Sequence, residues 1–395
     1  MDDIEGFRAE ARAWLEANAT VKTEAHEEIS MFSRIAGGTA ASLPQARAWQ
    51  RALADAGWAT VTWPRAFGGR DASPAQAIAL AEELARFDGP ERIFDIGTSI
   101  IGPTLMTHAS PEQQARYLPA MRDGSEIWCQ LWSEPDAGSD LAAVKTSAVL
   151  DGDEWVLNGQ KVWTSGAQYC DWGFGIFRTN ADVPKHRGIS CLIVDMRAPG
   201  IEIRPLRQIT GDAHFNEVFL TDVRVPAGNL VGEVDAGWTV AKTTMLFERM
   251  ATGAFPVAAA ATASLRRLPR DAHTDDGSAV LRDELAQVHT AGRLIDLTVE
   301  RVRAGLEAGR LPGAEGSILK LALAAHGTAV ADLGCATLGA AGLLTGPDAP
   351  EEARWPDALL GSIAVHIGGG TDEIQRNTIA ETVLGLPREP KPESP

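Results

Sequence analysis

The sequence predicts a mostly helical α+β protein in which a β domain lies between two helical domains. Apolar residues recur at helical spacing up to about residue 126, runs of β-branched residues separated by turns follow, and helical spacing returns from about residue 235. The length of 395 residues also exceeds the ~250–300 residues of a single core. We therefore expect domains at 1–126, 127–234 and 235–386, followed by a proline-rich, disordered tail at 387–395.

In the first domain, apolar residues at i, i+3 and i+4 predict helices at Ile4–Ala17, Leu43–Ala56, Ser73–Phe87 and Pro111–Met121. Ser73 and Ser110 each precede a proline, which favours a helix start, and Gln113 stands at the capping-box position.

In the middle domain, we expect a strand–turn–strand unit at 146–157 and strands at Gly188–Asp195, Ile201–Pro205 and Asn216–Leu220. Such short strands are typical of a small barrel or sandwich. In the last domain, long apolar stripes predict helices at Trp238–Ala260, Ala279–Glu307 and Gly316–Leu338, with a polar connector at Pro269–Gly277. Long helices joined by short loops form a bundle.

The formal charge is −17, from 53 acidic and 36 basic side chains. This balance argues against binding to a nucleic-acid backbone or to a membrane through a basic patch. Four scattered cysteines without a C-x-x-C pair, and no metal-type spacing of His, Asp or Glu, predict neither a disulfide framework nor a metal site. The acidic N-terminal segment and the lack of an 18-residue apolar run lead us to expect a reduced, cytoplasmic protein without a transmembrane helix.

The most informative segment is Gln130-Leu-Trp-Ser-Glu-Pro-Asp-Ala-Gly-Ser-Asp140. Pro135 fixes φ, Gly138 permits positive φ, and Ser139 and Asp140 can close local hydrogen bonds. Such a turn can present backbone N–H groups to an acceptor-rich ring or a pyrophosphate. By itself the segment is equally compatible with an ordinary β-turn.

A second segment, Asn158-Gly-Gln-Lys-Val-Trp-Thr-Ser165, follows about twenty residues later. Its indole, Trp163, stands beside two hydroxyl groups and can pack against a flat heterocycle, although an isolated tryptophan is more often part of the core.

Together these two segments resemble the acyl-CoA dehydrogenase family. Gly368-Gly-Gly-Thr-Asp-Glu-Ile-Gln-Arg376 near the C-terminus and Val223-Arg-Val-Pro226 at the end of the β domain extend the resemblance over the whole chain. The resemblance implies that the bundle of the last domain has four helices. It also implies a flavoenzyme that removes an α proton and a β hydride from an acyl-CoA thioester, with FAD as cofactor.

The resemblance also implies roles for individual residues. Gln130, Trp132 and Ser133 are expected to line the flavin ring, Trp163, Thr164 and Ser165 to flank its other edge, and Gly369, Gly370, Thr371 and Glu373 to reach the phosphate or adenosine side. Ser139 is expected near the thioester or pantetheine, and Arg249 among the donors that hold the polyanionic ligands.

The family places its catalytic glutamate either directly before the Gly-Thr of the C-terminal motif or on the first long helix after the β domain, before an arginine. The first position is Gly369 here, whereas the second reads Glu248-Arg249, as in the isovaleryl-type branch. The neighbours Leu246, Phe247 and Met250 would raise the pKa of Glu248 if that face is buried. An exposed glutamate on a mostly apolar helix is the alternative.

Two adenosine-side elements of the family are missing. The stretch where R-x-x-F-G is common reads Pro269–Gly277, with Arg282 as a possible substitute, and the usual glutamine position is Ala336. His214 and His366 are weaker candidates for contacts with substrate and flavin. The missing groups predict either a homo-oligomer (dimer or tetramer) with looser adenosine contacts or an α2β2 enzyme in which a sister chain supplies them.

Alternative functions are a flavin-dependent monooxygenase or oxidase on the same scaffold and a flavin-poor partner subunit; Glu248 and the intact ring-side segments count against both. An electron-transfer flavoprotein is the electron acceptor that the resemblance implies. The acyl chain stays open among branched, medium, dicarboxylic and steroid thioesters.

Overall fold

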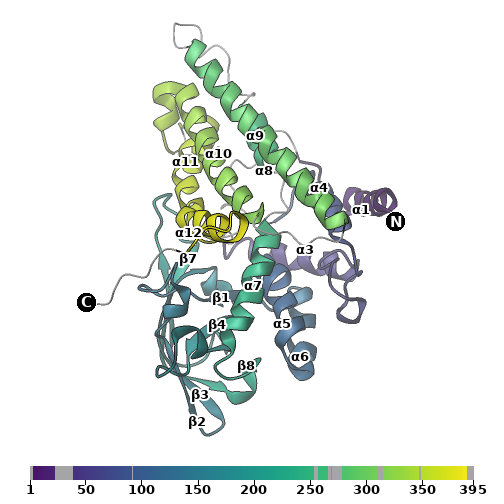
Figure 1. Cartoon of the computed structure of the whole chain (residues 1–395). Helices are drawn as coiled ribbons and strands as arrows, with labels where there is room; N and C mark the ends of the chain where they lie inside the picture. Colours follow the sequence, from purple (N-terminus) through teal and green to yellow (C-terminus); the bar gives the residue numbers. More distant parts are fainter. Residues whose placement is uncertain are drawn as a thin grey trace, which may run out of the picture. The chain divides into compact units, whose positions relative to one another are not determined.

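The computed structural model describes residues 3–22, 39–90, 92–252, 257–265, 268, 278–308, 315–346 and 348–388. The chain divides into two compact units: unit 1 is Met1–Thr23 with Ser33–Thr252, and unit 2 is Glu24–Phe32 with Gly253–Pro395. Figure 1 labels the elements of both units. The N-terminal helices, the β-sheet and the first helix after the sheet thus belong to one unit.

Four N-terminal helices confirm the local signals in the sequence: α1 (Ile4–Asn18), α3 (Leu43–Asp55), α4 (Pro74–Leu84) and α6 (Pro111–Arg122). A fifth helix, α5 (Gly102–His108), was not predicted. Ser73 and Ser110 begin α4 and α6 with complete capping boxes, in which serine and the glutamine three residues later bond to each other's backbone. A π-helix, η3 (Ile96–Ile101), runs into α5 and contacts α7 (Gly237–Thr252).

A cluster of arginines around Glu83 joins α1 to α4. The Glu83 carboxylate accepts hydrogen bonds from Arg12 at 2.7 and 2.9 Å and from Arg86 at 2.7 Å, with Arg8 at 3.3 Å. The hydrogen bonds from Arg12 lower the pKa of Glu83 to about 2, although desolvation opposes them. Ionised Glu83 therefore stabilises this helix pair at neutral pH.

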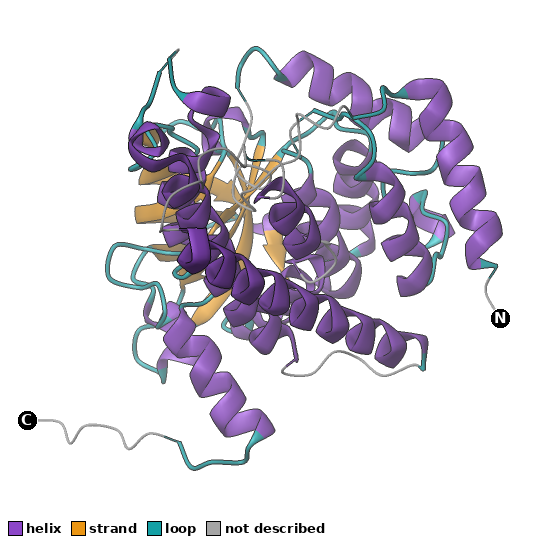
Figure 2. Ribbon diagram, turned by 90° about the horizontal axis from the view of Figure 1, so that it is seen from above, coloured by secondary structure: helices purple, strands orange, loops and turns teal. Residues whose placement is uncertain are grey.

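The strands, orange in Figure 2, form one mixed sheet in the described part of the chain. Its order is β6-β7-β3-β2-β4-β5-β8, and β1 pairs in parallel with β4. The bounds are β1 (Trp128–Leu131), β2 (Ser147–Asp151), β3 (Glu154–Ser165), β4 (Trp172–Arg178), β5 (Ile189–Asp195), β6 (Ile201–Leu206), β7 (Phe215–Pro226) and β8 (Leu230–Val231). The sequence patterns missed β1, β4 and β8, and they ended β3 eight residues and β7 six residues too early.

Strand β5 shows how the sheet separates two hydrophobic cores. Leu192 and Val194 belong to one buried cluster, whereas Cys191 and Ile193 belong to another that includes Leu105 of α5. Because successive side chains of a strand point to opposite faces, a strand covered on both sides reads as a continuous apolar run.

Unit 2 contains the predicted helical bundle: α8 (Val257–Leu265), α9 (Ser278–Glu307), α10 (Glu315–Leu338) and α11 (Arg354–Val365), followed by α12 (Asp372–Thr378). Helix α10 contacts the other four. Among the described residues, the segment Gly316–Leu343 is long and apolar enough, by length and composition, to cross a membrane. Because α10 packs against four other helices, its apolar composition is also that expected of the core helix of a bundle.

Some predictions about the C-terminal half lie outside the described residues. The helix predicted at Trp238–Ala260 corresponds to α7 and the start of α8, but residues 253–256 between them are not described. The connector at 269–277 and the tail beyond residue 388 also lie outside the described residues.

Candidate active site

The two segments singled out in the sequence meet in unit 1. The backbone N–H of Val162 donates a hydrogen bond to the Ser133 carbonyl at 2.8 Å, and the Lys161 ammonium donates to the Trp132 carbonyl at 3.1 Å. Lys161 also forms a 2.9 Å ion pair with Glu134. Residues about thirty positions apart are therefore held together at the end of β1 and in the second half of β3.

The Glu134–Lys161 pair is almost wholly buried, with side-chain exposures of 7% and 0%. Lys161 also donates to the Ile176 carbonyl at 2.8 Å, while Glu134 accepts the backbone N–H groups of Lys145 and Thr146 at 2.6 and 2.9 Å. Burial lowers the pKa of Lys161 to about 8, against the opposing charge of Glu134. Burial by itself raises the pKa of Glu134, but Lys161 and the backbone donors outweigh it and lower the pKa overall.

Neither charge received a role from the sequence, although each lies inside one of the two segments. The available signal was the single lysine of the second segment and the acidic residues Glu134, Asp136 and Asp140 of the first, among which the sequence does not single out Glu134.

The turn after β1 differs from the expectation at Gly138. Glu134 and Ala137 exchange backbone hydrogen bonds at 3.1 and 3.0 Å, so the chain reverses at Pro135 and Asp136. Gly138 lies beyond this reversal and does not adopt positive φ. The Asp140 carbonyl closes a local hydrogen bond with the Ala143 N–H at 2.9 Å, and its side chain binds Lys185 at 2.7 and 2.6 Å. Ser139 is exposed.

A β-bulge displays Trp163. The pairing of β3 with β7 shifts between Lys161 and Thr164, so that Val162 and Trp163 together oppose one residue, Glu217. Trp163 has a φ of +61° and is 60% exposed, with its ring edge-to-face on Phe215 at 6.1 Å. Because the left-handed conformation costs a non-glycine residue about 1–2 kcal/mol, this tryptophan is a strained, displayed side chain and not a core residue.

Buried polar atoms without a protein partner occur at two of the positions named from the sequence. They are Trp132 Nε1 and Thr164 Oγ1. Buried polar side-chain atoms are normally hydrogen-bonded, so such atoms need an explanation, and an absent ligand is one. Asn216, which the sequence did not indicate, supports this strand by donating to the Thr164 carbonyl at 3.0 Å.

Glu248 lies on α7, which contacts η3, α5 and β5. Burial raises the pKa of its carboxyl, while the charge of Arg249 and hydrogen bonding from the Gln130 side chain lower it in part. Glu248 keeps part of its surface accessible to solvent, and Arg249 is exposed. The candidate base therefore adjoins β1, which begins the first motif.

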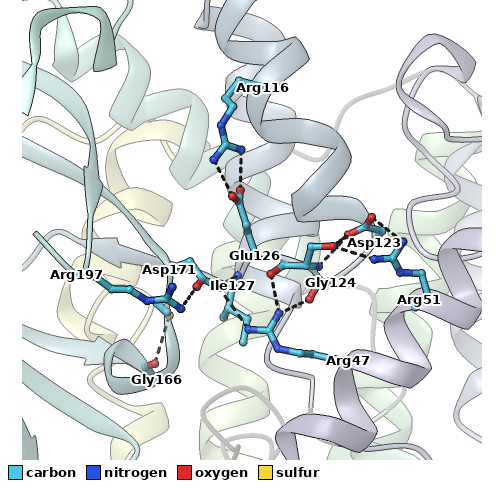
Figure 3. Close-up of polar contacts among 12 residues, drawn as sticks. Arg47, Arg51, Arg116, Asp123, Gly124, Glu126, Ile127, Gly166, Asp171 and Arg197 are labelled. Carbon is cyan, nitrogen blue, oxygen red and sulfur yellow. Dashed lines mark hydrogen bonds and ion pairs between the residues drawn. The ribbon is translucent and has the colours of Figure 1, made fainter.

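A polar cluster fixes the chain where it enters β1 (Figure 3). Asp171 accepts the Ile127 N–H at 2.9 Å and pairs with Arg197 and, at 3.5 Å, with Arg47. Arg47 also donates to the Gly124 carbonyl at 2.6 Å. These contacts set the start of the strand that carries Gln130.

The C-terminal motif lies in unit 2, so its grouping with the unit 1 residues stays a prediction. Gly369 and Gly370 have φ values of +65° and +85°, and Thr371 caps α12 by accepting the Ile374 N–H at 3.2 Å. Glu373 is exposed and pairs with Arg376 at 3.1 Å.

Three further candidates remain. His214 stands 3.5 Å from Asp212 in the loop before β7, and its carbonyl accepts the Gly166 N–H at 2.9 Å, directly after Ser165. Arg282 and Ala336 are exposed on α9 and α10. The four cysteines are free and buried, and the described residues include no group of three or more His, Cys, Asp or Glu that could hold a metal ion.

Comparison with known proteins identifies the family. The profiles of the acyl-CoA dehydrogenase N-terminal, middle and C-terminal domains match residues 2–125, 129–223 and 235–384. Acyl-CoA dehydrogenase IpdE1 of Mycobacterium tuberculosis is 41% identical over 393 residues, which cover 99% of this chain and 100% of that protein. The chain belongs to the acyl-CoA dehydrogenase family. It is therefore an oxidoreductase.

Two solved structures resemble this acyl-CoA dehydrogenase over nearly its whole length. The steroid ACAD Tcur3481-Tcur3483 has a TM-score of 0.83 and 28% identity, covering 98% of this chain and 100% of that one. The ChsE4-ChsE5 complex from Mycobacterium tuberculosis has a TM-score of 0.79 and 30% identity, covering 98% and 99%. Both confirm the acyl-CoA dehydrogenase fold.

Proposed function

We propose that this acyl-CoA dehydrogenase uses FAD to convert an acyl-CoA thioester to its trans-2-enoyl-CoA, with Glu248 as the base that removes the α proton. The observation that carries the proposal is the Glu248 carboxyl beside Gln130, with a pKa that burial raises. A general base works best when its pKa lies near the working pH, and an ordinary glutamate pKa of about 4.3 is too low for that.

The residues present fit a flavin ring. Trp132 Nε1 is a donor and Thr164 Oγ1 is both donor and acceptor, and both are buried without a protein partner. The ring of a flavin carries carbonyl oxygens, acceptor nitrogens and an N–H, which complement these groups. The exposed indole of Trp163 adds a flat apolar surface beside them.

FAD, when bound, supplies a hydride acceptor at its N5 atom. The protein residues have the other tasks. Glu248 takes the α proton, and Gln130 orients its carboxyl. Trp132, Ser133, Thr164 and Ser165 hold the ring edges, while Ser139 and Arg249 contact the CoA thioester. Gly369, Gly370, Thr371 and Glu373 hold the phosphate and adenosine side.

The substrate class that we propose is a steroid-derived acyl-CoA. The structural relative Tcur3481-Tcur3483 is described as a steroid ACAD. We further propose an α2β2 assembly with a sister chain, because Tcur3481-Tcur3483 and ChsE4-ChsE5 each combine two chains. Such a chain would supply the adenosine-side groups that Ala336 and the 269–277 stretch lack. An electron-transfer flavoprotein would then reoxidise the flavin.

The experiment is a titration of the purified full-length protein with steroid and straight-chain acyl-CoAs under anaerobic conditions. We expect a yellow protein that the substrate bleaches, and Glu248→Gln should keep the flavin spectrum but slow the bleaching by about 10²–10⁴-fold, the contribution of a general base. Glu233→Gln, which removes an exposed carboxylate just before α7, is the matched control and should bleach normally.

The alternatives give different results. Bleaching that survives Glu248→Gln would refute the base assignment. A colourless, inactive chain would favour the partner-subunit function. A protein that acyl-CoA does not bleach, and that consumes oxygen only after its flavin has been reduced by another reductant, would favour the monooxygenase or oxidase.

A further inference from the structure

A polar network in unit 2 pins the two ends of the glycine loop, which we define as residues 367–371. His366 precedes the loop and Asp372 follows it. Their side chains meet at 2.7 Å between Nδ1 and Oδ2, and the Asp372 N–H donates to the His366 carbonyl at 3.0 Å. Lys320 of α10 bridges both ends, donating to Asp372 Oδ1 at 2.9 Å and to the His366 carbonyl at 3.2 Å.

The network extends into the bundle. His366 Nε2 lies 3.1 Å from the hydroxyl of Thr328, which donates to Ser362 at 3.0 Å. Helices α10, α11 and α12, which Figure 1 labels in unit 2, are therefore connected through the ends of the loop.

The ion pair at the centre of this network is largely buried. The Lys320 and Asp372 side chains are 9% and 14% exposed. Desolvation raises the pKa of Asp372, but hydrogen bonds from His366 and Lys320 outweigh it and lower the pKa overall. Removing one partner of such a pair leaves a buried charge uncompensated, so the arrangement is favourable only when it is complete.

The loop needs this support because of its composition. Gly369 and Gly370 adopt positive φ, and a Cβ atom at Gly370 would lie 2.7 Å from Gln375 Nε2. Consecutive glycines lose more backbone entropy on ordering than other residues. A ligand that needs the loop in one conformation binds more tightly when that conformation is already formed.

We infer that Lys320, Asp372 and His366 are positioning residues, which hold the glycine loop ready for the phosphate and adenosine side of FAD. The inference rests on the proposed function for the role of the loop. The inference adds that FAD affinity depends on these three side chains, which join the two ends of the loop.

The test compares FAD affinity, by quenching of flavin fluorescence, in the full-length protein and in Asp372→Asn, Lys320→Met and their double variant. Each single variant should weaken FAD binding by about 10-fold, equivalent to about 1.4 kcal/mol, because it strands a buried charge. The double variant should recover part of the loss, since it leaves neither charge unpaired. Arg293→Gln, which removes an exposed ion pair with Asp296 on α9, is the control and should bind FAD normally.

Hydrogen exchange of the loop amides without cofactor gives an independent readout. It should accelerate in the single variants while the core of the bundle stays protected. His366→Ala keeps the ion pair, so it tests the network even if a charge variant fails to fold, and it should also accelerate exchange and weaken FAD. Unchanged affinity and exchange in folded variants would overturn the inference. If the wild type binds no FAD, the proposed function fails, and the exchange data still decide whether the network orders the loop.

Discussion

The buried pair Glu134–Lys161 offers the sharpest test of how the segments Gln130–Asp140 and Asn158–Ser165 are assembled. The perturbation is a double-mutant cycle of Glu134→Gln and Lys161→Met. At the observed 2.9 Å, Coulomb attraction at an effective dielectric constant of about 20 amounts to about 6 kcal/mol. Part of this is offset because Glu134 also binds two backbone amides, so we expect a coupling of about 2–4 kcal/mol at pH 7, within the range for close charge pairs.

The two single variants should differ. Lys161→Met leaves Glu134 ionised and partly unpaired, so it should cost about 3–5 kcal/mol. In Glu134→Gln, Lys161 can lose its proton, because its pKa is already only about 8 with its partner present. The cost of that variant is therefore smaller at neutral pH.

The pH dependence makes the test specific. Because the folded pKa of Lys161 lies below the unfolded value of 10.5, its own contribution to stability rises as the pH rises from about 8 to about 10.5. The coupling to Glu134 should fall over the same window, since a neutral amine no longer attracts the carboxylate.

The assay is urea unfolding of the cofactor-free protein at pH 7 and pH 9.5. The exposed Arg224–Glu154 pair between β7 and β3 serves as the matched control, with no coupling expected beyond error. A Glu134–Lys161 coupling below about 0.5 kcal/mol at pH 7, the additivity limit for independent sites, would refute the reasoning. An unchanged coupling at pH 9.5 would refute it as well.

Three further predictions concern other charged or strained residues. The kcat/KM of the enzyme should fall with decreasing pH through the raised pKa of Glu248, and Arg249→Gln should move this acidic limb to higher pH because Arg249 lowers that pKa; a limb that stays in place would contradict this. Trp163→Gly should change the stability of the cofactor-free protein by no more than about 1 kcal/mol, since relief of the +61° φ offsets the lost ring contact, yet it should weaken FAD binding in a fluorescence titration; equal FAD affinity would argue against contact with the flavin. Ionised Glu83 stabilises the fold above its unfolded pKa of about 4.5, and this stabilisation is lost as the pH falls toward about 2. Glu83→Gln should therefore lower the free energy of unfolding by about 3 kcal/mol at pH 7 and remove the loss of stability between pH 4.5 and pH 2 in denaturation curves. A variant whose stability changes with pH in the same way as that of the wild type would contradict the assignment.

The sequence was sufficient wherever structure depends on nearby residues. The helix starts at Ser73 and Ser110 need only residues within one turn, and each forms as its pattern indicates. Strand β1 was missed because it has only four residues and no alternation of apolar and polar side chains. It is formed by pairing with β4, about forty residues further along the chain. The second half of β3 contains Gly159 and Lys161, which weaken any strand pattern, and both are accommodated by tertiary contacts.

The candidate site shows the same division. The residue types of the two segments were visible, but the contacts that join them were not, since a sequence does not say that Glu134 and Lys161 face each other. The expectation of positive φ at Gly138 failed because Pro135 already completes the reversal. The effect of burial on Glu248 depended on the position of α7 against β1, which periodicity along α7 does not determine.

Locally unfavourable features converge on these two segments, and their coincidence is the argument that the segments bind a ligand. An unpaired buried donor by itself does not mark a site, because Trp155 Nε1 and Thr60 Oγ1 are also unpaired. Within Gln130–Asp140 and Asn158–Ser165, however, unpaired donors occur together with a left-handed tryptophan and a fully buried lysine. Each of these costs free energy in the chain by itself. A flavin would satisfy the donors and cover the indole, and the ion pair would keep both segments in place for it, so that the strain becomes useful only with the cofactor bound.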